Sequence, residues 1–159
     1  MIDWLLAHPK PEKQPFSNSG ALAPCEEGEC GEIMALVDGT ELAEGANART
    51  FWKETGTTSG YGDITGQYAL DMTLMDIPGQ LEPVPVHAKG RVLYFTEAGD
   101  EVYWEQETNL LPSGQLVFTA TMLRGKGALE GVYGKVSGTV QPTETGFTFE
   151  GSGWWWPDE

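Results

Sequence analysis

The stretch of residues 102–107, Val-Tyr-Trp-Glu-Gln-Glu, holds the residues best suited to acid–base chemistry. If it forms a strand, Trp104 and Gln106 share one side, and Glu105 and Glu107 share the other. With the Trp104 side inward, Gln106 is a polar group that can orient a ligand. With the other side inward, two carboxyl groups share one cavity, and Glu105 with a raised pKa can act as a general acid or base. The alternation leaves both orientations open.

Two further residues complete the candidate catalytic set with Glu105. His87 opens a predicted strand and has a side chain that titrates near neutrality, so it is a candidate general base. The same position is also typical of a surface or capping residue. Arg91 lies within that strand, as Arg124 does in a later one. Each either pairs with surface acids or binds a carboxylate or enolate oxygen of a ligand.

Aromatic side chains are frequent in the predicted strands and would line an apolar lumen that suits a hydrophobic or aromatic ligand. The candidate ligand-binding residues are Gln106 and the aromatic residues Trp52, Tyr68, Tyr94, Trp104, Phe118 and Phe149. The alternative is that these side chains simply fill the core of a small barrel. Glu54 lies in phase with Trp52, which leaves open whether its carboxyl group points inward near a mouth of the barrel.

The residue types present exclude several kinds of active site. The chain has two histidines, so a three-histidine catalytic zinc is excluded, and no Ser lies in a Gly-x-Ser-x-Gly elbow. No Asp-x-Asp-x-Asp loop supports a calcium site, and the glycines of residues 125–134 lack the spacing of a nucleotide-binding loop. The sequence therefore predicts neither a metal site nor a cofactor, with a cation site made of carboxylates alone as the open alternative.

Composition narrows the partners and the compartment. The 159 residues include 24 Asp and Glu against 9 Lys and Arg, and this net charge of −15 opposes binding to nucleic acid or anionic membranes. No apolar run approaches the length of about 18 residues that a membrane span needs. Cys25 and Cys30 are too few for a closed zinc site. The acidic residues between them should raise the pKa values of the thiols and make them less reactive. We expect free thiols in a reducing cytosol, with a local disulfide as the alternative. We therefore predict a cytoplasmic protein that binds a small molecule.

Period-two alternation predicts an all-β fold. It is clearest in residues 64–74, where Tyr68, Leu70 and Met72 fall on one face. The other predicted strands are 33–37, 49–54, 88–97, 102–110, 116–123, 136–141 and 147–155. About eight sequential antiparallel strands close most naturally into an up-and-down barrel, whose lumen holds packed side chains or one small ligand. A two-sheet sandwich is the alternative.

The domain boundary is predicted near residue 30. Residues 1–30 are rich in Pro, Ser and Gly, and we expect them to form an irregular N-terminal arm before a barrel domain of residues 31–159. Trp4, Leu5, Leu6 and Phe16 would let this arm pack onto the domain or onto a neighbouring subunit.

The most distinctive segment is glycine-rich. Residues 125–136, Gly-Lys-Gly-Ala-Leu-Glu-Gly-Val-Tyr-Gly-Lys-Val, follow the predicted strand at 116–123. The pattern predicts a tight turn, a short helical turn that packs Leu129 and Tyr133, and then the next strand. This strand–bend–strand pattern resembles the allene oxide cyclase-like barrels, a calycin-like group that includes plant allene oxide cyclases, dirigent proteins and bacterial spirotetronate-type cyclases. The resemblance covers about residues 114–153, extends back to Thr57 and does not include residues 1–30.

The resemblance implies an eight-stranded barrel that is open at one end and often forms dimers or trimers. Characterised members guide a reactive, lipophilic intermediate into one ring or one stereoisomer by shape and a few polar groups. For this chain it implies a homo-oligomeric enzyme of the cyclase or isomerase type with a lipophilic substrate in the lumen. It transfers no catalytic residue. A lipocalin-like binding protein without activity and a filled structural barrel are the competing hypotheses, because a fold does not fix a function.

Overall fold

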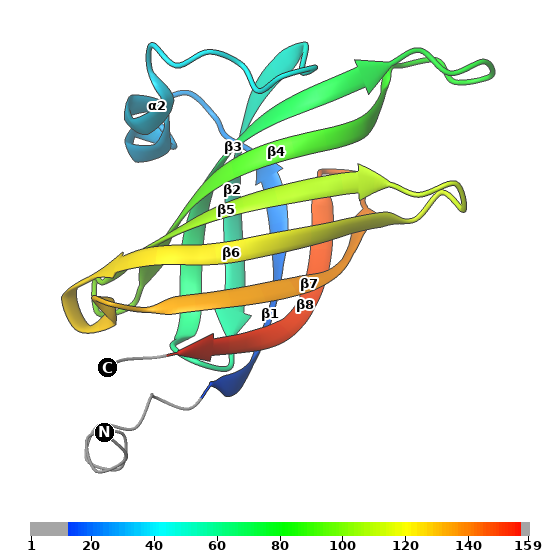
Figure 1. Cartoon of the computed structure of the whole chain (residues 1–159). Helices are drawn as coiled ribbons and strands as arrows, with labels where there is room; N and C mark the ends of the chain where they lie inside the picture. Colours follow the sequence, from blue (N-terminus) through cyan, green and yellow to red (C-terminus); the bar gives the residue numbers. More distant parts are fainter. Residues whose placement is uncertain (1–12, 157–159) are drawn as a thin grey trace, which may run out of the picture.

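Eight antiparallel strands follow one another around a closed barrel in the computed structural model, which describes residues 13–156 (Figure 1). Each strand pairs with the next along the chain, and β8 pairs with β1 to complete the ring. The strands are β1 (Gln14–Pro24), β2 (Ala48–Thr58), β3 (Gly62–Met75), β4 (Val84–Thr96), β5 (Glu101–Leu110), β6 (Leu116–Lys126), β7 (Tyr133–Pro142) and β8 (Phe147–Trp156). The structure confirms the predicted up-and-down barrel.

The first strand corrects the predicted arm. Gln14–Pro24 forms β1, which pairs with both β2 and β8, so the barrel begins well before residue 31. Its inward positions include Phe16, Asn18 and Leu22, and this mixture of polar and apolar residues gives no clear alternation in the sequence. Phe16 is part of the barrel core rather than of an arm that packs onto the domain from outside. Trp4, Leu5 and Leu6 lie outside the described residues.

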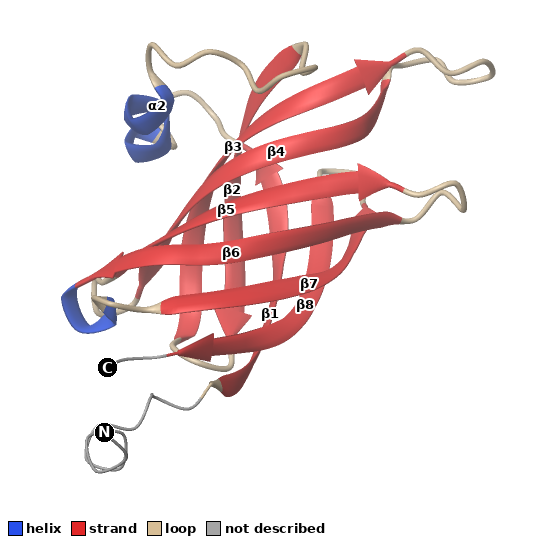
Figure 2. Ribbon diagram, viewed as in Figure 1, coloured by secondary structure: helices blue, strands red, loops and turns tan. Residues whose placement is uncertain are grey.

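The second correction concerns the short apolar run that follows β1. Gly31–Val37 forms the helix α2 instead of a strand (Figure 2). Ile33 and Val37 are both buried, and their spacing of four residues places them on one face of a helix. This face packs on Ala69 at the outside of the barrel. A run this short does not distinguish a strand from one side of a helix.

The two ends of the barrel differ. At one end, the rings of Tyr61, Trp104 and Trp155 lie around Phe16, with ring centroids 5.6, 5.9 and 5.3 Å from that of Phe16. The β6–β7 connection, with its 3₁₀ turn η1 (Gly127–Leu129), adds buried apolar side chains here. This closed end also holds the β2–β3 and β4–β5 turns. The β3–β4, β5–β6 and β7–β8 turns lie at the opposite end, which we call the mouth, and the β3–β4 and β5–β6 connections project there in Figure 1.

The glycine-rich bend follows the predicted course only in part. Leu129 is buried within η1, as the sequence predicts. Tyr133 instead begins β7, is 39% exposed and stacks on Trp156, with ring centroids 5.4 Å apart. The prediction that Tyr133 packs inside the bend is wrong, because β7 starts one residue after the buried Val132 and turns Tyr133 outward.

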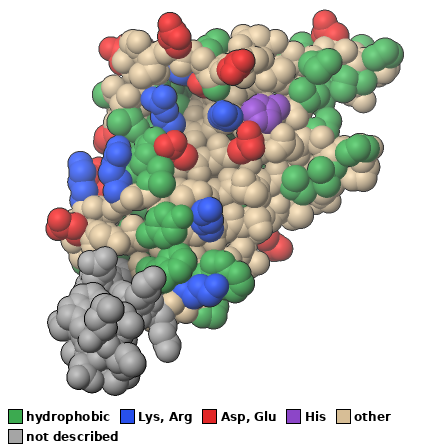
Figure 3. Space-filling view, in the orientation of Figure 1, with side chains coloured by type: hydrophobic (Ala, Val, Ile, Leu, Met, Phe, Trp, Pro, Cys, Tyr) green, Lys and Arg blue, Asp and Glu red, His purple; other side chains and the backbone are tan. Residues whose placement is uncertain are grey.

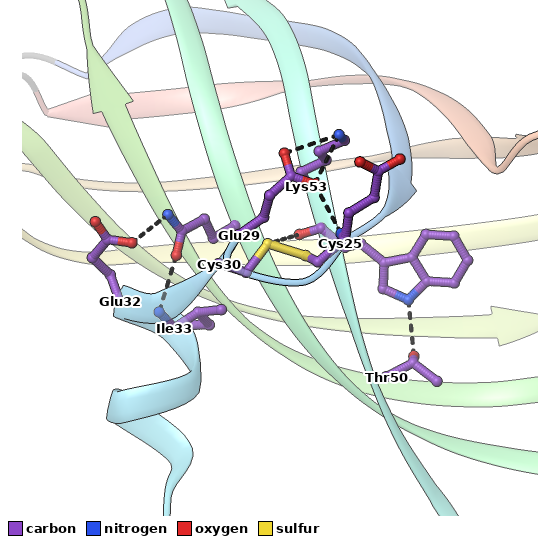
Figure 4. Close-up of a disulfide and its surroundings, with 10 residues drawn as sticks. Cys25, Glu29, Cys30, Glu32, Ile33, Thr50 and Lys53 are labelled. Carbon is purple, nitrogen blue, oxygen red and sulfur yellow. Dashed lines mark hydrogen bonds and ion pairs between the residues drawn. A yellow bond between two sulfur atoms is a disulfide. The ribbon is translucent and has the colours of Figure 1, made fainter.

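A disulfide between Cys25 and Cys30 ties the segment that carries α2 to the barrel (Figure 4). The favoured prediction of free thiols is therefore wrong, and the alternative of a local disulfide is correct. The backbone N–H of Cys25 donates to the carbonyl of Phe51, and Lys53 pairs with Glu29 at 2.9 Å, so both flanks of the disulfide are fixed on β2. Two cysteines five residues apart carry no signal of their own that distinguishes a bridge from two thiols.

An ion pair holds the segment between α2 and β2. Arg49 Nε lies 2.6 Å from Asp71 Oδ1, and the same guanidinium donates to the carbonyls of Val37, Thr40 and Glu41. The guanidinium beside Asp71 holds the pKa of that carboxyl below its usual value. Asp71 faces outward from β3, opposite to its lumen-facing neighbours Leu70 and Met72, and the α2 segment covers it. No helix among the described residues is long and apolar enough to cross a membrane.

Candidate functional site

The lumen contains a narrow cavity that reaches from the middle of the barrel to the mouth. Its volume is about 60 Å³. Its walls are mainly aromatic and aliphatic, and the lining residues include Leu22, Leu70, Met72, Val92, Leu116, Val140 and Phe147. Leu116, Val140 and Phe147 are only half-buried and mark the mouth. This volume is smaller than that of an engineered apolar cavity of about 150 Å³ that holds benzene. Even a ligand of the size of benzene must therefore extend through the mouth or displace flexible side chains.

A carboxyl group and two phenols meet at the inner part of this lumen. The Tyr68 hydroxyl donates to Glu54 Oε1 in a short hydrogen bond, and the Tyr94 hydroxyl donates to the same oxygen at 3.1 Å. The two hydroxyl oxygens are 3.0 Å apart. Glu54 is 3% exposed, and the tyrosines are 4% and 3% exposed. Tyr68 and Tyr94 also line the cavity, whereas Glu54 lies behind them. We call these three residues the Glu54 cluster.

Glycines make the space that Glu54 occupies. A Cβ on Gly20 would lie 2.7 Å from Glu54 Oε2, and a Cβ on Gly56 would lie 2.6 Å from the same atom. A Cβ on Gly66 would lie 3.0 Å from the ring of Tyr94. These glycines come from β1, β2 and β3, so three adjacent strands lack a side chain where the carboxyl group is held. Such glycines inside strands mark a close approach rather than a turn.

Burial sets the charge of the Glu54 cluster. Removal from water raises the pKa of Glu54 from 4.5 to about 8, although the hydrogen bonds from Tyr68 and Tyr94 lower it. Burial, together with the nearby carboxyl group, also raises the pKa of both tyrosines. The carboxyl group is therefore mainly protonated at neutral pH. Because Oε1 accepts from both phenols, the acidic proton belongs on Oε2.

Several buried side-chain polar atoms in and around the lumen have no hydrogen-bond partner within residues 13–156. They are Asn18 Oδ1, Glu54 Oε2, Tyr61 OH and Trp104 Nε1. Buried polar atoms are usually paired, and leaving one unpaired costs about 1–3 kcal/mol. Asn18 and Trp104 line the cavity itself. The inner lumen therefore offers both an acceptor and a donor to a molecule that enters it.

The structure places most of the predicted ligand-binding side chains around the cavity. The residues that line it are Tyr68, Tyr94, Trp104, Gln106, Phe118 and Phe149. Trp52 is the exception. It packs against the core from β2, where its ring lies 5.1 Å from that of Phe147 and its Nε1 donates to Thr50 Oγ1.

The predicted catalytic residues do not meet in the lumen. Trp104 is 2% exposed and faces inward, so Glu105 points out of the barrel and is exposed. Arg91 pairs in register with Glu105 and also faces outward, in a shallow outer hollow beside α2. These two placements exclude Glu105 and Arg91 from any chemistry in the lumen. Arg124 also faces outward, with its guanidinium 4.3 Å from the ring centroid of Tyr103.

His87 occupies the rim of the mouth. It borders the cavity, and its Nε2 lies 2.9 Å from Glu107 Oε2. A register shift between Thr73 and Leu74 next to it interrupts the alternation, so period-two reasoning cannot place this side chain. His87 is thus the one predicted catalytic residue that borders the lumen, far along the cavity wall from the closed end.

Comparison with known proteins gives no relative. No protein-family model, curated protein or solved structure matches the chain. Within the described residues, no group of three or more His, Cys, Asp or Glu side chains is arranged to hold a metal ion. The function must therefore be argued from the lumen itself.

Among the polar residues of the lumen, Tyr68, Tyr94 and Gln106 were predicted, the direction of Glu54 was left open, and Asn18 was not predicted. The phase of Glu54 with Trp52 was one signal that its side chain faces inward, but this phase alone did not fix the direction. The stronger signal was glycine inside strands, at Gly20, Gly56 and Gly66, which makes room for a buried group. Asn18 could not be found, since the strand that carries it was not predicted.

Proposed function

We propose that this protein holds a small lipophilic molecule in its lumen and promotes an isomerisation or ring closure. The observation that carries the proposal is the Glu54 cluster at the inner part of an apolar cavity. A purely apolar pocket would favour storage, and a completely filled barrel would favour a structural role. Convergent hydroxyl groups in a water-poor site favour chemistry in which charge develops on a substrate oxygen.

Each member of the cluster has a separate part in this proposal. Tyr94 is the hydroxyl that donates to the substrate oxygen: its single O–H turns from Glu54 Oε1, 3.1 Å away, to the ligand, while Tyr68 keeps its hydrogen bond to the carboxyl group. Tyr68 and Glu54 are positioning residues that hold Tyr94. The walls of the lumen fold the substrate, which lowers the entropic barrier to ring closure. Isomerisation and ring closure leave the number of electrons unchanged, so the step needs no redox partner.

The resemblance of the glycine-rich bend to the allene oxide cyclase-like barrels supports the same class of reaction. The barrel has the expected strand number and order. The homo-oligomeric state that the resemblance implies remains part of the proposal.

A binding protein without catalytic activity is the second candidate. The specific observation in its favour is that Glu54 lies behind the tyrosines and does not itself line the cavity. In that case the Glu54 cluster only satisfies the polar end of a stored ligand.

The disulfide bears on the compartment. Structural disulfides persist mainly in oxidising compartments, whereas the composition predicts a cytoplasmic protein. We propose that the protein works where Cys25 and Cys30 stay oxidised. Alkylation of free thiols in freshly lysed host cells, followed by mass spectrometry, tests this. Two alkylated cysteines would contradict the proposal and support the predicted location in the reducing cytosol.

The first experiment is native mass spectrometry of the protein purified from its own host, with identification of any retained molecule. The retained molecule, or otherwise a lipid extract of the host, is then incubated with wild-type protein, Tyr94→Phe or Tyr133→Phe. Tyr133 is an exposed outer residue and provides the matched control. We expect a product of unchanged mass and altered chromatographic retention with wild type and Tyr133→Phe, and at least a tenfold slower reaction with Tyr94→Phe.

The other outcomes separate the hypotheses. A retained molecule that is never converted supports the binding protein. Absence of both a retained molecule and a conversion, together with tryptophan fluorescence that no hydrophobic ligand changes, supports a filled barrel and overturns both candidates.

A further inference from the structure

The charges of this protein are segregated between its lumen and its outer surface. Among residues 13–156 every Lys and Arg side chain lies outside the barrel: Lys13, Arg49, Lys53, Lys89, Arg91, Arg124, Lys126 and Lys135. Figure 3 shows several of these side chains on the outer face of the barrel. The lumen contains one ionisable acid, Glu54, and no described cation. A carboxylate that entered head-first would therefore find a hydrogen-bond donor such as Trp104 Nε1 but no counter-charge.

Entry in the opposite orientation offers no better partner. A ligand that entered tail-first would leave its carboxylate at the mouth, beside His87. The Nε2 atom of His87 is already 2.9 Å from the carboxylate of Glu107, so a second carboxylate there meets the like charge of Glu107. In that orientation the polar atoms of the inner lumen would also receive an apolar tail.

A neutral oxygen fits the same lumen in the head-first orientation. The Tyr94 hydroxyl can donate to it by turning from Glu54 Oε1, and Asn18 Oδ1 is a buried acceptor without a partner in the described chain. Both residues line the cavity. An alcohol can accept one hydrogen bond and donate another, so it matches both groups, whereas a carboxylate can only accept.

From this arrangement we infer that the lumen takes neutral lipophilic molecules that carry a hydroxyl or carbonyl oxygen, and discriminates against carboxylates. The inference rests on the proposed function, since it presumes that the lumen binds a ligand. It narrows the substrate class, and it separates this protein from barrels that bind fatty acids as anions. The physical basis is that burying a charge without a partner costs far more than burying a neutral, hydrogen-bonded group.

The test compares matched pairs of probes that differ only in the head group. Alkan-1-ols and alkanoates of six to twelve carbons are titrated into the wild-type protein at pH 7, with calorimetry and tryptophan fluorescence as readouts. Trp104 lines the cavity, so a change in the tryptophan emission of the protein reports that the cavity is occupied. We expect the best alcohol to bind at least tenfold more tightly than the alkanoate of the same length.

Two variants sharpen the result. Tyr94→Phe removes the donor and should weaken binding of the alcohol by about three- to tenfold, while binding of the alkanoate stays unchanged. Gln106→Arg introduces a cation on the cavity wall and should reverse the preference. Tyr133→Phe, on the outer surface, should change neither.

The outcomes distinguish this inference from the proposed function. Alcohol binding with weak or absent alkanoate binding supports the inference. Alkanoates that bind as tightly as alcohols, or more tightly, overturn the inference and leave the proposed function intact. If neither class binds at any chain length, the lumen is closed to such molecules, and both the inference and the proposed function are lost.

Discussion

Two carboxyl groups on neighbouring strands are treated in opposite ways by this barrel. Asp71 on β3 faces outward, is covered by the α2 segment and is paired with Arg49. Glu54 on β2 faces inward, is completely covered and meets only phenols. The cation lowers the pKa of Asp71, and burial raises the pKa of Glu54. Two covered carboxyl groups therefore become a charged, structural carboxylate beside a cation on one side of the wall and a neutral, hydrogen-bonding acid, more deeply buried, on the other.

The largest expected effect is that Glu54 and Asp71 make stability depend on pH in opposite directions. Glu54 has its pKa raised by folding from 4.5 to about 8, so its contribution is fully present below pH 4.5 and is lost as the pH rises to 8. Relative to wild type, Glu54→Gln should gain about 3–5 kcal/mol in free energy of unfolding across that window. Urea denaturation of both proteins at several pH values measures this difference. A constant difference would show that Glu54 is already charged in the folded state.

The next effect tests the outer carboxylate. Arg49→Ala leaves Asp71 covered and without its cation, which should reduce the free energy of unfolding by about 2–4 kcal/mol at pH 7. Asp71→Asn in the same background should recover part of the loss, because it removes the unpaired charge. The stabilisation by Asp71 disappears as the pH falls through its lowered pKa, the reverse of the behaviour of Glu54. Additive losses in the double variant would contradict a direct pair.

The covering segment itself gives a smaller effect. Replacing both Cys25 and Cys30 by Ser removes a short covalent loop and should destabilise the protein by about 2 kcal/mol. Hydrogen exchange should increase in α2 and at Asn47, with no change in the Glu54 cluster, because the segment lies outside the barrel wall. Faster exchange in the inner strands would mean that the two regions are coupled.

The smallest effects compare single hydroxyl groups. Tyr68→Phe removes the shorter hydrogen bond to Glu54 and should cost about 1–2 kcal/mol, while Tyr94→Phe should cost about 1 kcal/mol. Tyr133→Phe on the surface should stay within about 0.5 kcal/mol of wild type. The order of the first two is the informative result, and its reversal would assign the anchoring role to Tyr94.

The fold was largely predictable, because inward and outward residues alternate cleanly in strands such as β3, with Tyr68, Leu70 and Met72 on one face. β1 escaped prediction because its inward face includes Asn18 and Gly20. The inward direction of Trp104 was one of two alternatives that local sequence could not separate, since both sides of β5 carry bulky residues.

The site was less predictable for a different reason. The members of the Glu54 cluster lie on three strands, and they meet only through the cross-strand register, which pairs Tyr68 with Val92 and Glu54 with Gly66. Register depends on turn lengths and bulges, and the alternation of one strand contains neither. The charge of a carboxyl group is also not readable from the sequence, because Glu54 and Glu105 are the same residue type, one buried and the other exposed.

The packed aromatic rings around Phe16 have a kinetic consequence. Because these rings close one end of the barrel, the lumen has a single opening. A molecule that reaches the Glu54 cluster must therefore leave through the mouth by which it entered. Incoming and outgoing molecules then share a single file past Met72, Leu116 and Phe147. Under the proposed function, the product must leave the lumen before the next substrate molecule can enter. Accumulated product therefore competes directly with substrate for the same opening.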